Sequence, residues 1–370
     1  MRRLAPSVFV TDASYPNCLA AIRALARAGA VVTAGERDSM TCRATIGFWS
    51  RFCSHRFWYP DPAKNPQAAA SALEEYFSKN TFDAVIPIGL EMTAFFIQHA
   101  GRFRVPTMLP GAESFAIAGD KSKTFQFAES AGVRIPRTFF AADYRHAGLP
   151  CVFKHPRTGV LIAQSRPEAE AIVSRLGSEL CRYVVQEFIP GRNGFGYFGF
   201  YVDGVEHGYF MHERLMQFPI EGGPSVEARS FYDEKLHDAG RRVLTGLKWH
   251  GVAMVEFKRS DSDGEYYLME VNPKFWGSLD LAIQSGCNFP VWVLNYILRR
   301  TCETPGSYDQ RTHYQWVVPN GVKCFLRYRD YRGTFLAHLL DPRVRKDVAI
   351  TDPLPTLAGL ASMAGHLVRP

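Results

Sequence analysis

The feature that most constrains the fold of this chain is a predicted β-hairpin in the stretch 252–278, which carries charged side chains on one face only. Its strands are expected at residues 252–259 and 265–271, joined by a polar turn centred on Asp263. The other face collects apolar side chains suited to burial: Val255, Phe257, Tyr267, Met269 and Val271. Because a slip by one residue would turn all of them to the wrong side, the pattern fixes the register.

In this register two carboxylates face each other. Glu256 lies directly opposite Glu270, and Asn272 follows on the same face. Like charges across a ladder destabilise it unless a cation lies between them, and Mg²⁺ meets that need because it binds few carboxylates and keeps positions for water and phosphate oxygens. Lys274 is expected on the same face, beside the ion. The alternative is a solvated hairpin face with two unrelated glutamates.

The first third of the chain alternates strand and helix signals. Strands are expected at residues 7–11, 30–34 and 84–88, and helices at 17–27, 65–77 and 91–100. Such alternation predicts a parallel sheet covered by helices on both faces.

After about residue 111 the pattern changes to mixed elements and hairpins. Helices are expected at residues 121–130, 167–176 and 233–248, and strands at 151–154 and 183–187. Asp203-Gly204, between strand-like runs at 197–202 and 205–211, is a strong signal for a two-residue hairpin turn.

Four motifs follow one another in an informative order. They are Gly119-Asp120-Lys121 with the following Gly132-Val133 and Ile135-Pro136-Arg137-Thr138, then Val152-Phe153-Lys154-His155-Pro156, the run VVQEFIPG at 184–191, and the set Glu256, Glu270 and Asn272. Over residues 7–300 this order resembles the ATP-grasp superfamily, in particular carboligases related to the ATP-binding domains of carbamoyl-phosphate synthase and biotin carboxylase. The resemblance implies an α/β N-terminal parallel-sheet domain (1–110) and a two-subdomain ATP-grasp fold of α+β type. Its small subdomain and hinge would span 111–190 and its large subdomain with the metal site 191–300, followed by a C-terminal extension, 301–370.

The resemblance also implies ATP and Mg²⁺, with Mn²⁺ as an alternative ion. Lys121 and Lys154 would reach the nucleotide phosphates, where two ammonium groups balance triphosphate charge. The adenine would lie against the hinge, formed by Gln186, Glu187, Phe188 and Ile189. There Glu187 would accept from the adenine amino group. The ion would be held by Glu256, Glu270 and Asn272 and would bridge the phosphates.

A second cluster contains His212, Glu213 and Arg214, followed by Gly222-Gly223-Pro224-Ser225 and Arg229. Related carboligases carry a similar segment. We expect Arg214 to bind a carboxylate or acyl phosphate, because a planar guanidinium suits bidentate oxyanion recognition. Lys274 stands where the family usually has an arginine, and these two residues are the catalytic candidates. The alternative is an ordinary surface hairpin and turn.

Two segments depart from the family pattern. The flap after the lysine strand is short, with only Arg157-Thr158-Gly159 before Val160, and Arg192-Asn193 stand where relatives often hold the ribose with acidic residues.

Composition narrows the class of protein further. The 370 residues are 46% hydrophobic and 21% charged, which excludes a disordered or fibrous chain. The net charge of +7 comes from scattered basic residues without a nucleic-acid-binding motif, so no nucleic-acid partner is expected. The eight cysteines form no C-x-x-C pair, which favours a reduced, cytoplasmic protein. No stretch reaches the roughly 20 apolar residues of a membrane span.

The C-terminal segment predicts a short amphipathic helix. Basic residues Arg343, Arg345 and Lys346 precede a leucine stripe formed by Leu354, Leu357, Leu360 and Leu367. We expect this helix to dock on the protein's own core. Contact with a membrane surface or with a second subunit, as in a homodimer, is the alternative.

The combined prediction is an ADP-forming, ATP-dependent ligase that joins a small-molecule carboxylate to an amine through an acyl phosphate. The alternatives are an ATP-grasp reaction with a thiol or bicarbonate acceptor, a kinase, or an ATP-binding regulatory or scaffolding protein without turnover.

Overall fold

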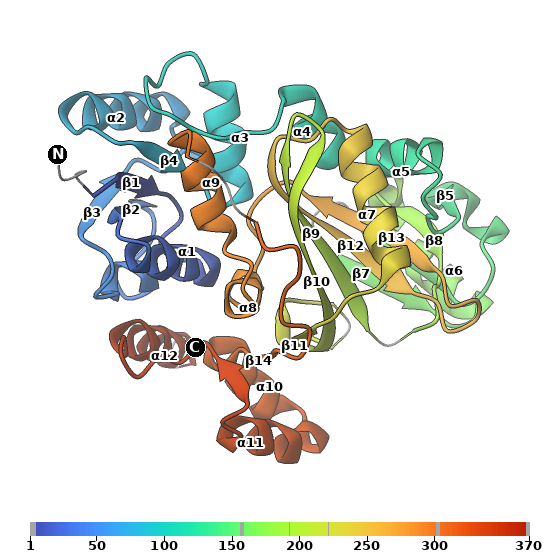
Figure 1. Cartoon of the computed structure of the whole chain (residues 1–370). Coiled ribbons are helices and arrows are strands. Elements are labelled where there is room, and N and C mark those ends of the chain that lie inside the picture. Colours follow the sequence, from blue (N-terminus) through green and yellow to red (C-terminus); the bar gives the residue numbers. More distant parts are fainter. Residues whose placement is uncertain (1–4, 156–158, 192, 221, 301–303, 368–370) are drawn as a thin grey trace.

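The computed structural model describes residues 5–155, 159–191, 193–220, 222–300 and 304–367. Three sheets organise these residues: a four-stranded sheet near the N-terminus, a second four-stranded sheet, and a seven-stranded sheet between them. Figure 1 shows the N-terminal layer in blue, the seven-stranded sheet in the middle and the C-terminal helices below. Among the described residues, none of the helices combines the length and apolar character needed to cross a membrane.

The N-terminal sheet is parallel throughout, in the order β3-β2-β1-β4. Its strands are β1 (Ser7–Val10), β2 (Val31–Arg37), β3 (His55–Tyr59) and β4 (Ala84–Ile86), and its helices are α1 (Pro16–Arg27), α2 (Pro66–Lys79) and α3 (Leu90–Gln98). Val8 and Val10 are buried in the same cluster as residues of α1, whereas Phe9 is buried with residues of α2 and α3. Helices therefore cover both faces, which confirms the predicted parallel-sheet domain.

Helices α4 (Ala112–Ala118) and α5 (Lys121–Ser130) lead from this domain to the second sheet. The Asp120 side chain caps α5 by accepting hydrogen bonds from the backbone N–H groups of Ser122 and Lys123. Lys121 therefore stands in the first turn of a helix, as predicted.

The second sheet has the strand order β5-β8-β6-β7 and is antiparallel. Its strands are β5 (Thr138–Phe140), β6 (Cys151–His155), β7 (Gly159–Ala163) and β8 (Val184–Glu187). Helix α6 (Arg166–Leu176) covers the face on which Phe153 and Val185 are buried. Since successive side chains of a strand alternate, Lys154 and its cross-strand partner Val184 face the opposite side.

The seven-stranded sheet has the order β13-β12-β9-β10-β11-β14-β15. Its strands are β9 (Gly194–Val202), β10 (Val205–Gln217), β11 (Ser225–Ser230), β12 (Gly251–Arg259), β13 (Tyr266–Asn272), β14 (His313–Gln315) and β15 (Val344–Lys346). Helix α7 (Glu234–Gly246) packs on one face, and α8 (Leu279–Gln284) and α9 (Phe289–Ile297) share the buried cluster of the other. The predicted hairpin at Asp203-Gly204 is confirmed, and both residues have positive φ angles, 49° and 83°, as a type I′ turn requires.

The predicted register of the β12–β13 hairpin is correct at the carboxylates but shifts beyond them. Glu256 pairs with Glu270, whereas the next pair is Phe257 with Leu268, so a β-bulge leaves Met269 without a partner. The prediction that Tyr267 and Met269 lie on the buried face is therefore wrong.

Because of the bulge, Tyr266 and Leu268 fill the apolar layer instead. The Met269 Sδ lies 3.7 Å from the Lys154 Nζ. The bulge thus adds a thioether to the face that carries Glu270.

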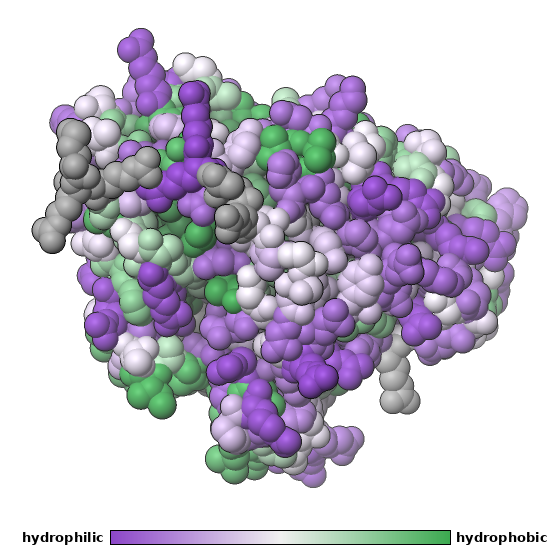
Figure 2. All heavy atoms as spheres, viewed as in Figure 1, coloured by the Kyte–Doolittle hydropathy of each residue, from purple (hydrophilic) through white to green (hydrophobic). Residues whose placement is uncertain are grey.

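Strands β14 and β15 extend the large sheet, and helices α10 (Val322–Arg327), α11 (Arg332–Leu340) and α12 (Leu354–Leu367) complete the C-terminal segment. Residue Asp352, just before α12, forms a buried ion pair with Arg23 of α1, with Oδ2 2.9 Å from Nε. Helix α12 does dock on the protein, but through a different face from the predicted one. Pro355 and Ala358 are buried, and the leucines Leu354, Leu357 and Leu360 are exposed. Figure 2 shows hydrophobic atoms at the lower edge of the molecule, in the region of α11 and α12.

Candidate active site

A cavity of about 560 Å³ lies where the large sheet meets the N-terminal domain. Its wall includes Tyr15 and Pro16 from the N-terminal domain and the indoles of Trp276 and Trp316. It also includes all of the predicted catalytic and metal-binding residues: Arg214, Glu256, Glu270, Asn272 and Lys274. The cavity also receives the loop Gly223-Pro224-Ser225. Residues from distant parts of the chain thus form one polar pocket with aromatic walls.

The two glutamates face each other across the β12–β13 ladder, and each carries a cationic partner. Glu256 Oε2 lies 3.0 Å from Arg214 Nη2, and Glu270 Oε2 lies 3.4 Å from Lys121 Nζ. Asn272 Nδ2 donates to Glu270 Oε1 at 2.9 Å. The cations and the amide relieve the repulsion that two carboxylates in register would otherwise exert.

Glu270 is held in its ionised form. Burial alone would raise its pKa, but the Lys121 ammonium, the hydrogen bond from Asn272 and the charge of Lys154 outweigh burial, and the pKa lies below its usual range. The carboxylate is therefore available as an anionic ligand at neutral pH.

Lys154 has an unusual electrostatic environment. Burial, together with the positive charge of Lys121, lowers its pKa to about 8, although Glu270 and Glu256 oppose this change. An anion bound beside Lys154 would offset the effect of the Lys121 charge on its protonation. The pair is thus suited to phosphate oxygens, whose charge would stabilise both protonated lysines.

Arg214 uses most of its hydrogen-bonding capacity on protein groups. Nε donates to Ser225 Oγ at 3.1 Å, Nη1 donates to Gln217 Oε1 and Glu256 Oε1, and Nη2 donates to Glu256 Oε2. A guanidinium has five N–H groups, so a single N–H of Nη2 is left beyond these contacts. Arg214 therefore orients Glu256 and can still donate into the cavity.

The loop before Ser225 is tightly built. A Cβ on Gly223 would lie 2.1 Å from the Phe218 carbonyl oxygen, so only glycine fits there. The backbone N–H of Gly222 donates to the Pro219 carbonyl oxygen, and it is therefore used within the loop rather than offered to an anion.

Lys274 follows β13 and lines the same cavity. Burial lowers its pKa, while the charges of Glu270 and Asp12 raise it, and the balance is a lowered pKa. The predicted position of this ammonium beside the carboxylates agrees with the structure.

The hinge residues lie on and after β8, apart from the carboxylate pair. Gln186 is buried, and its Nε2 donates to Thr138 Oγ1 at 2.8 Å. Since Gln186 pairs with Val152, its side chain lies on the same face of the sheet as Lys154. Glu187 forms an ion pair with Arg137, with Oε2 2.8 Å from Nε.

The ring of Phe188 lies 4.6 Å from the Lys258 Nζ, and Ile189 is buried. A cavity of about 650 Å³, with Arg137 and Val184 in its wall, lies between α5 and this sheet. Arg157 and Thr158 of the short flap, and Arg192 after the hinge, lie outside the described residues.

Sequence reasoning missed several contributors. Met269 reaches Lys154 only because of the bulge, and Arg137 and Gln217 act as partners of predicted residues. His212, from the predicted Arg214 cluster, is buried against Phe198, and burial together with the Arg214 charge holds its pKa well below the usual range. A neutral, enclosed imidazole adds no charge to the pocket.

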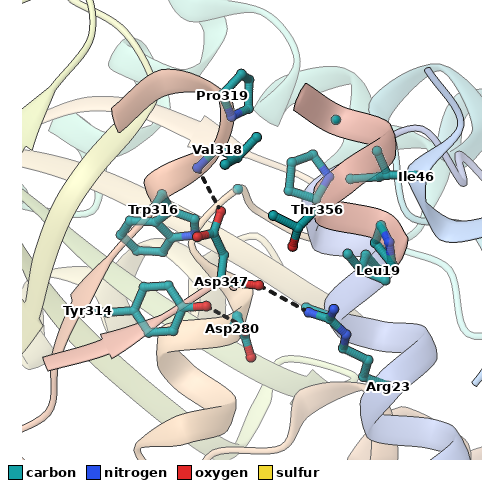
Figure 3. Close-up of a pocket in the computed structure, with 15 residues that line it drawn as sticks. Leu19, Arg23, Ile46, Asp280, Tyr314, Trp316, Val318, Pro319, Asp347 and Thr356 are labelled. Carbon is teal, nitrogen blue, oxygen red and sulfur yellow. Dashed lines mark hydrogen bonds between the residues drawn. The ribbon is translucent and has the colours of Figure 1, made fainter. Parts of the chain in front are cut away.

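A second pocket of about 60 Å³ adjoins the cavity and shares Pro16, Gly277 and Trp316 with its wall. Figure 3 shows Asp347 in this pocket, turned toward the backbone N–H of Val318. Residues of the N-terminal domain, the large sheet and the C-terminal segment thus line this small pocket.

The donor chemistry of the main cavity fits Mg²⁺ and a nucleoside triphosphate. Glu256, Glu270 and Asn272 offer hard oxygen donors, the class that Mg²⁺ and Mn²⁺ bind. Lys121 and Lys154 lie next to these donors, where phosphate oxygens would need positive charge.

Comparison with known proteins identifies the fold. A family model described as ATP-grasp in the biosynthetic pathway with Ter operon matches residues 226–318. An ADP complex of PurK, an N5-carboxyaminoimidazole ribonucleotide synthetase, superposes with a TM-score of 0.66 over 89% of this chain and 87% of its own, at 12% identity. This chain has the ATP-grasp fold. The L-amino acid ligase from Bacillus licheniformis gives a TM-score of 0.62 at 17% identity, over 80% of this chain and 75% of that one.

Curated relatives match a shorter part of this chain. A probable alpha-L-glutamate ligase from Cellvibrio japonicus is 29% identical over 128 residues, and one from Hahella chejuensis is 33% identical over 128 residues. Each match covers 30% of this chain and 42% of the relative. The chain therefore spans less than half the length of these relatives.

Proposed function

We propose that this ATP-grasp protein is an ADP-forming ligase that joins a carboxylate to an amine. The observation that carries the proposal is the cavity beside the Glu256–Glu270 pair, which Arg214 and Lys274 line from two sides. It has room for an acid and an amine next to the place where phosphate charge is balanced. The names of the curated glutamate ligases support an amino acid as one partner.

The proposed reaction proceeds in two steps. A carboxylate oxygen of the acid attacks the γ-phosphorus of ATP, the bond to the β-phosphate oxygen breaks, and ADP and an acyl phosphate result. The amine nitrogen then attacks the acyl carbon, a C–N bond forms, phosphate leaves with the C–O electron pair, and the nitrogen loses a proton to solvent. The protein mainly supplies position and positive charge, as in other phosphoryl transfers.

Different residues would bind the nucleotide phosphates and the metal ion. Lys121 and Lys154 would neutralise the nucleotide phosphates, and Glu256, Glu270 and Asn272 would hold Mg²⁺. When bound, Mg²⁺ supplies charge neutralisation for the phosphates.

On the acid side, the remaining N–H of Arg214 and the Lys274 ammonium would bind the carboxylate. These groups keep the two anionic reactants close despite their mutual repulsion.

The proposal is tested by supplying the purified chain with ATP, Mg²⁺ and a panel of amino acids and short peptides as acid and amine. We expect ADP and phosphate to appear only when both substrates are present. Release of AMP and pyrophosphate would contradict the acyl phosphate scheme. ADP formed with a thiol or bicarbonate in place of the amine would assign a different ATP-grasp reaction.

A matched pair of variants separates an enzyme from an ATP-binding scaffold. Glu270→Gln removes charge from the proposed metal ligand and should abolish ADP release. Glu265→Gln changes a glutamate of the same hairpin that pairs with Lys235 on the surface, and it should leave turnover unchanged. Absence of turnover in the unsubstituted chain with every pair, with retained ATP binding, would favour the scaffold.

A further inference from the structure

Three potential metal ligands lie close together near the edge of the large sheet that is formed by β14 and β15. They are Glu227 of β11, His313 of β14 and His338 of α11, and one ligand atom from each lies within 4.8 Å of the other two. None of the three belongs to the proposed nucleotide site or to the four sequence motifs that resemble the ATP-grasp superfamily. Two imidazoles and one carboxylate form the donor set of many zinc sites.

The cluster lies on the face of the large sheet opposite the active-site cavity. Glu227 pairs with Gln315 and Ala228 pairs with Tyr314 across the β11–β14 ladder. Tyr314 is buried on the side of the N-terminal domain and lines the small pocket of Figure 3. Since side chains alternate, Glu227 and His313 face away from that pocket, toward α11.

The distances suit a tetrahedral ion. His338 Nδ1 lies 3.0 Å from Glu227 Oε2, and His313 Nε2 lies 3.6 Å from the same oxygen. Ligands of a tetrahedral zinc ion with bonds of about 2.0–2.1 Å are about 3.3 Å apart. These two separations lie on either side of that value, and the ligand nitrogens of the two histidines lie within 4.8 Å of each other.

The surroundings hold the carboxylate but leave one imidazole nitrogen, 3.6 Å from that carboxylate, without a hydrogen bond. Tyr331 Oη donates to Glu227 Oε1 at 2.6 Å and Gln315 Nε2 donates to it at 3.1 Å. Hydrogen bonds of this kind orient the carboxylate and are typical of metal ligands. His313 Nε2 is buried and has no hydrogen-bond partner. Arg229, two residues along β11, forms its ion pair with Glu213.

We propose that Glu227, His313 and His338 bind one divalent transition-metal ion of the zinc type. The imidazoles select such an ion over Mg²⁺, so the site differs chemically from the oxygen donors of the nucleotide site. The ion would join β11 of the large sheet to β14 and α11 of the C-terminal segment. Glu227 lies two residues after Ser225, which accepts a hydrogen bond from Arg214. The ion would therefore also stabilise the strand that carries Ser225.

The test measures metal content of the full chain. The protein is stripped with a chelator, given Zn²⁺, dialysed and analysed by mass spectrometry for metal, and its affinity is measured by competition with a zinc-binding dye. We expect one Zn²⁺ ion per chain and a higher melting temperature with Zn²⁺. His338→Ala and His313→Ala should each weaken Zn²⁺ binding by roughly 100-fold or more. Removing a metal ligand lowers the affinity by more than removing a residue that only hydrogen-bonds to a ligand.

Two controls identify where the ion binds. His55→Ala removes an exposed imidazole of β3, and Glu270→Gln alters the nucleotide site; both should bind Zn²⁺ like the unsubstituted chain. Co²⁺ in place of Zn²⁺ should give the visible absorption of a tetrahedral ion, and His338→Gln should remove it. A chain that retains no Zn²⁺ after dialysis, or histidine variants that bind it unchanged, would overturn the assignment.

Discussion

The Arg214 guanidinium lies in a two-pronged contact with the Glu256 carboxylate, with Nη2 3.0 Å from Oε2 and Nη1 3.3 Å from Oε1. This contact joins β10 to β12 across β9, and it connects the residue proposed to bind the acid with a residue proposed to hold the metal. A planar fork is needed to satisfy both carboxylate oxygens and Ser225 together.

Replacing Arg214 by lysine should therefore lower kcat by about 100-fold, the usual cost of one lost oxyanion donor. The charge is kept, but an ammonium cannot reach three acceptors with the same geometry. Steady-state kinetics of ADP release measures the effect. Arg102→Lys, at a surface pair with Glu74, is the matched control and should have unchanged kinetics. Equal kcat values for Arg214→Lys and the unsubstituted chain would remove Arg214 from the mechanism.

Nucleotide affinity should fall as the pH rises past about 8. The pKa of Lys154 is lowered to about 8, so its ammonium is present below that pH and lost above it. A bound phosphate stabilises the ammonium, and binding at higher pH must therefore take up a proton. Calorimetric titration of ADP from pH 7 to 9 checks this. Lys154→Arg should remove the dependence, and an affinity of the unsubstituted chain that is flat over this range would contradict the placement of Lys154 at the phosphates.

Asp347 should make stability depend on pH in the acidic range. Burial raises its pKa to about 7 from an ordinary value of 3.8, so the folded state keeps a proton that the unfolded state has lost. Its contribution to the free energy of unfolding is therefore greatest at low pH, decreases between about pH 4 and 7, and is constant above. Asp347→Asn keeps an oxygen that can accept from the Val317 N–H. Urea unfolding should show this variant gaining stability relative to aspartate between pH 5 and 8; a constant difference would contradict the raised pKa.

The ion pair between Arg23 and Asp352 should fasten the C-terminal segment to the N-terminal domain. Asp352 also accepts hydrogen bonds from Ser50 Oγ at 2.7 Å and the Arg51 N–H at 2.9 Å. Asp352→Ala leaves Arg23 buried without its charge partner, which typically costs about 3–5 kcal/mol. Urea unfolding measures the loss of free energy of unfolding. Asp341→Ala removes a more exposed pair with Arg343 and should cost less than about 1 kcal/mol. Similar losses for both variants would show that the buried pair stabilises the fold no more than a surface pair does.

Local patterns made part of this molecule predictable. The Asp203-Gly204 turn and the register that opposes Glu256 to Glu270 follow from short-range alternation and turn chemistry. Met269 was misplaced because one extra residue in a strand changes the face of those beyond it, and residue spacing does not reveal a bulge.

Contacts between distant segments were harder to predict from the sequence. His313 and His338 meet Glu227 only after β14 joins β11 and α11 folds over them. The exposed leucines of α12 show a related effect: the helix buries its small residues against the N-terminal domain, so its most hydrophobic stripe is not the one that docks.

Activation of the acid by phosphorylation can be followed with an acid that carries ¹⁸O in its carboxylate. After turnover with ATP and an amine, we expect one ¹⁸O atom in the released phosphate, because the bridging oxygen of the acyl phosphate stays bonded to phosphorus when the amide forms. Phosphate without ¹⁸O, or label in AMP, would contradict it.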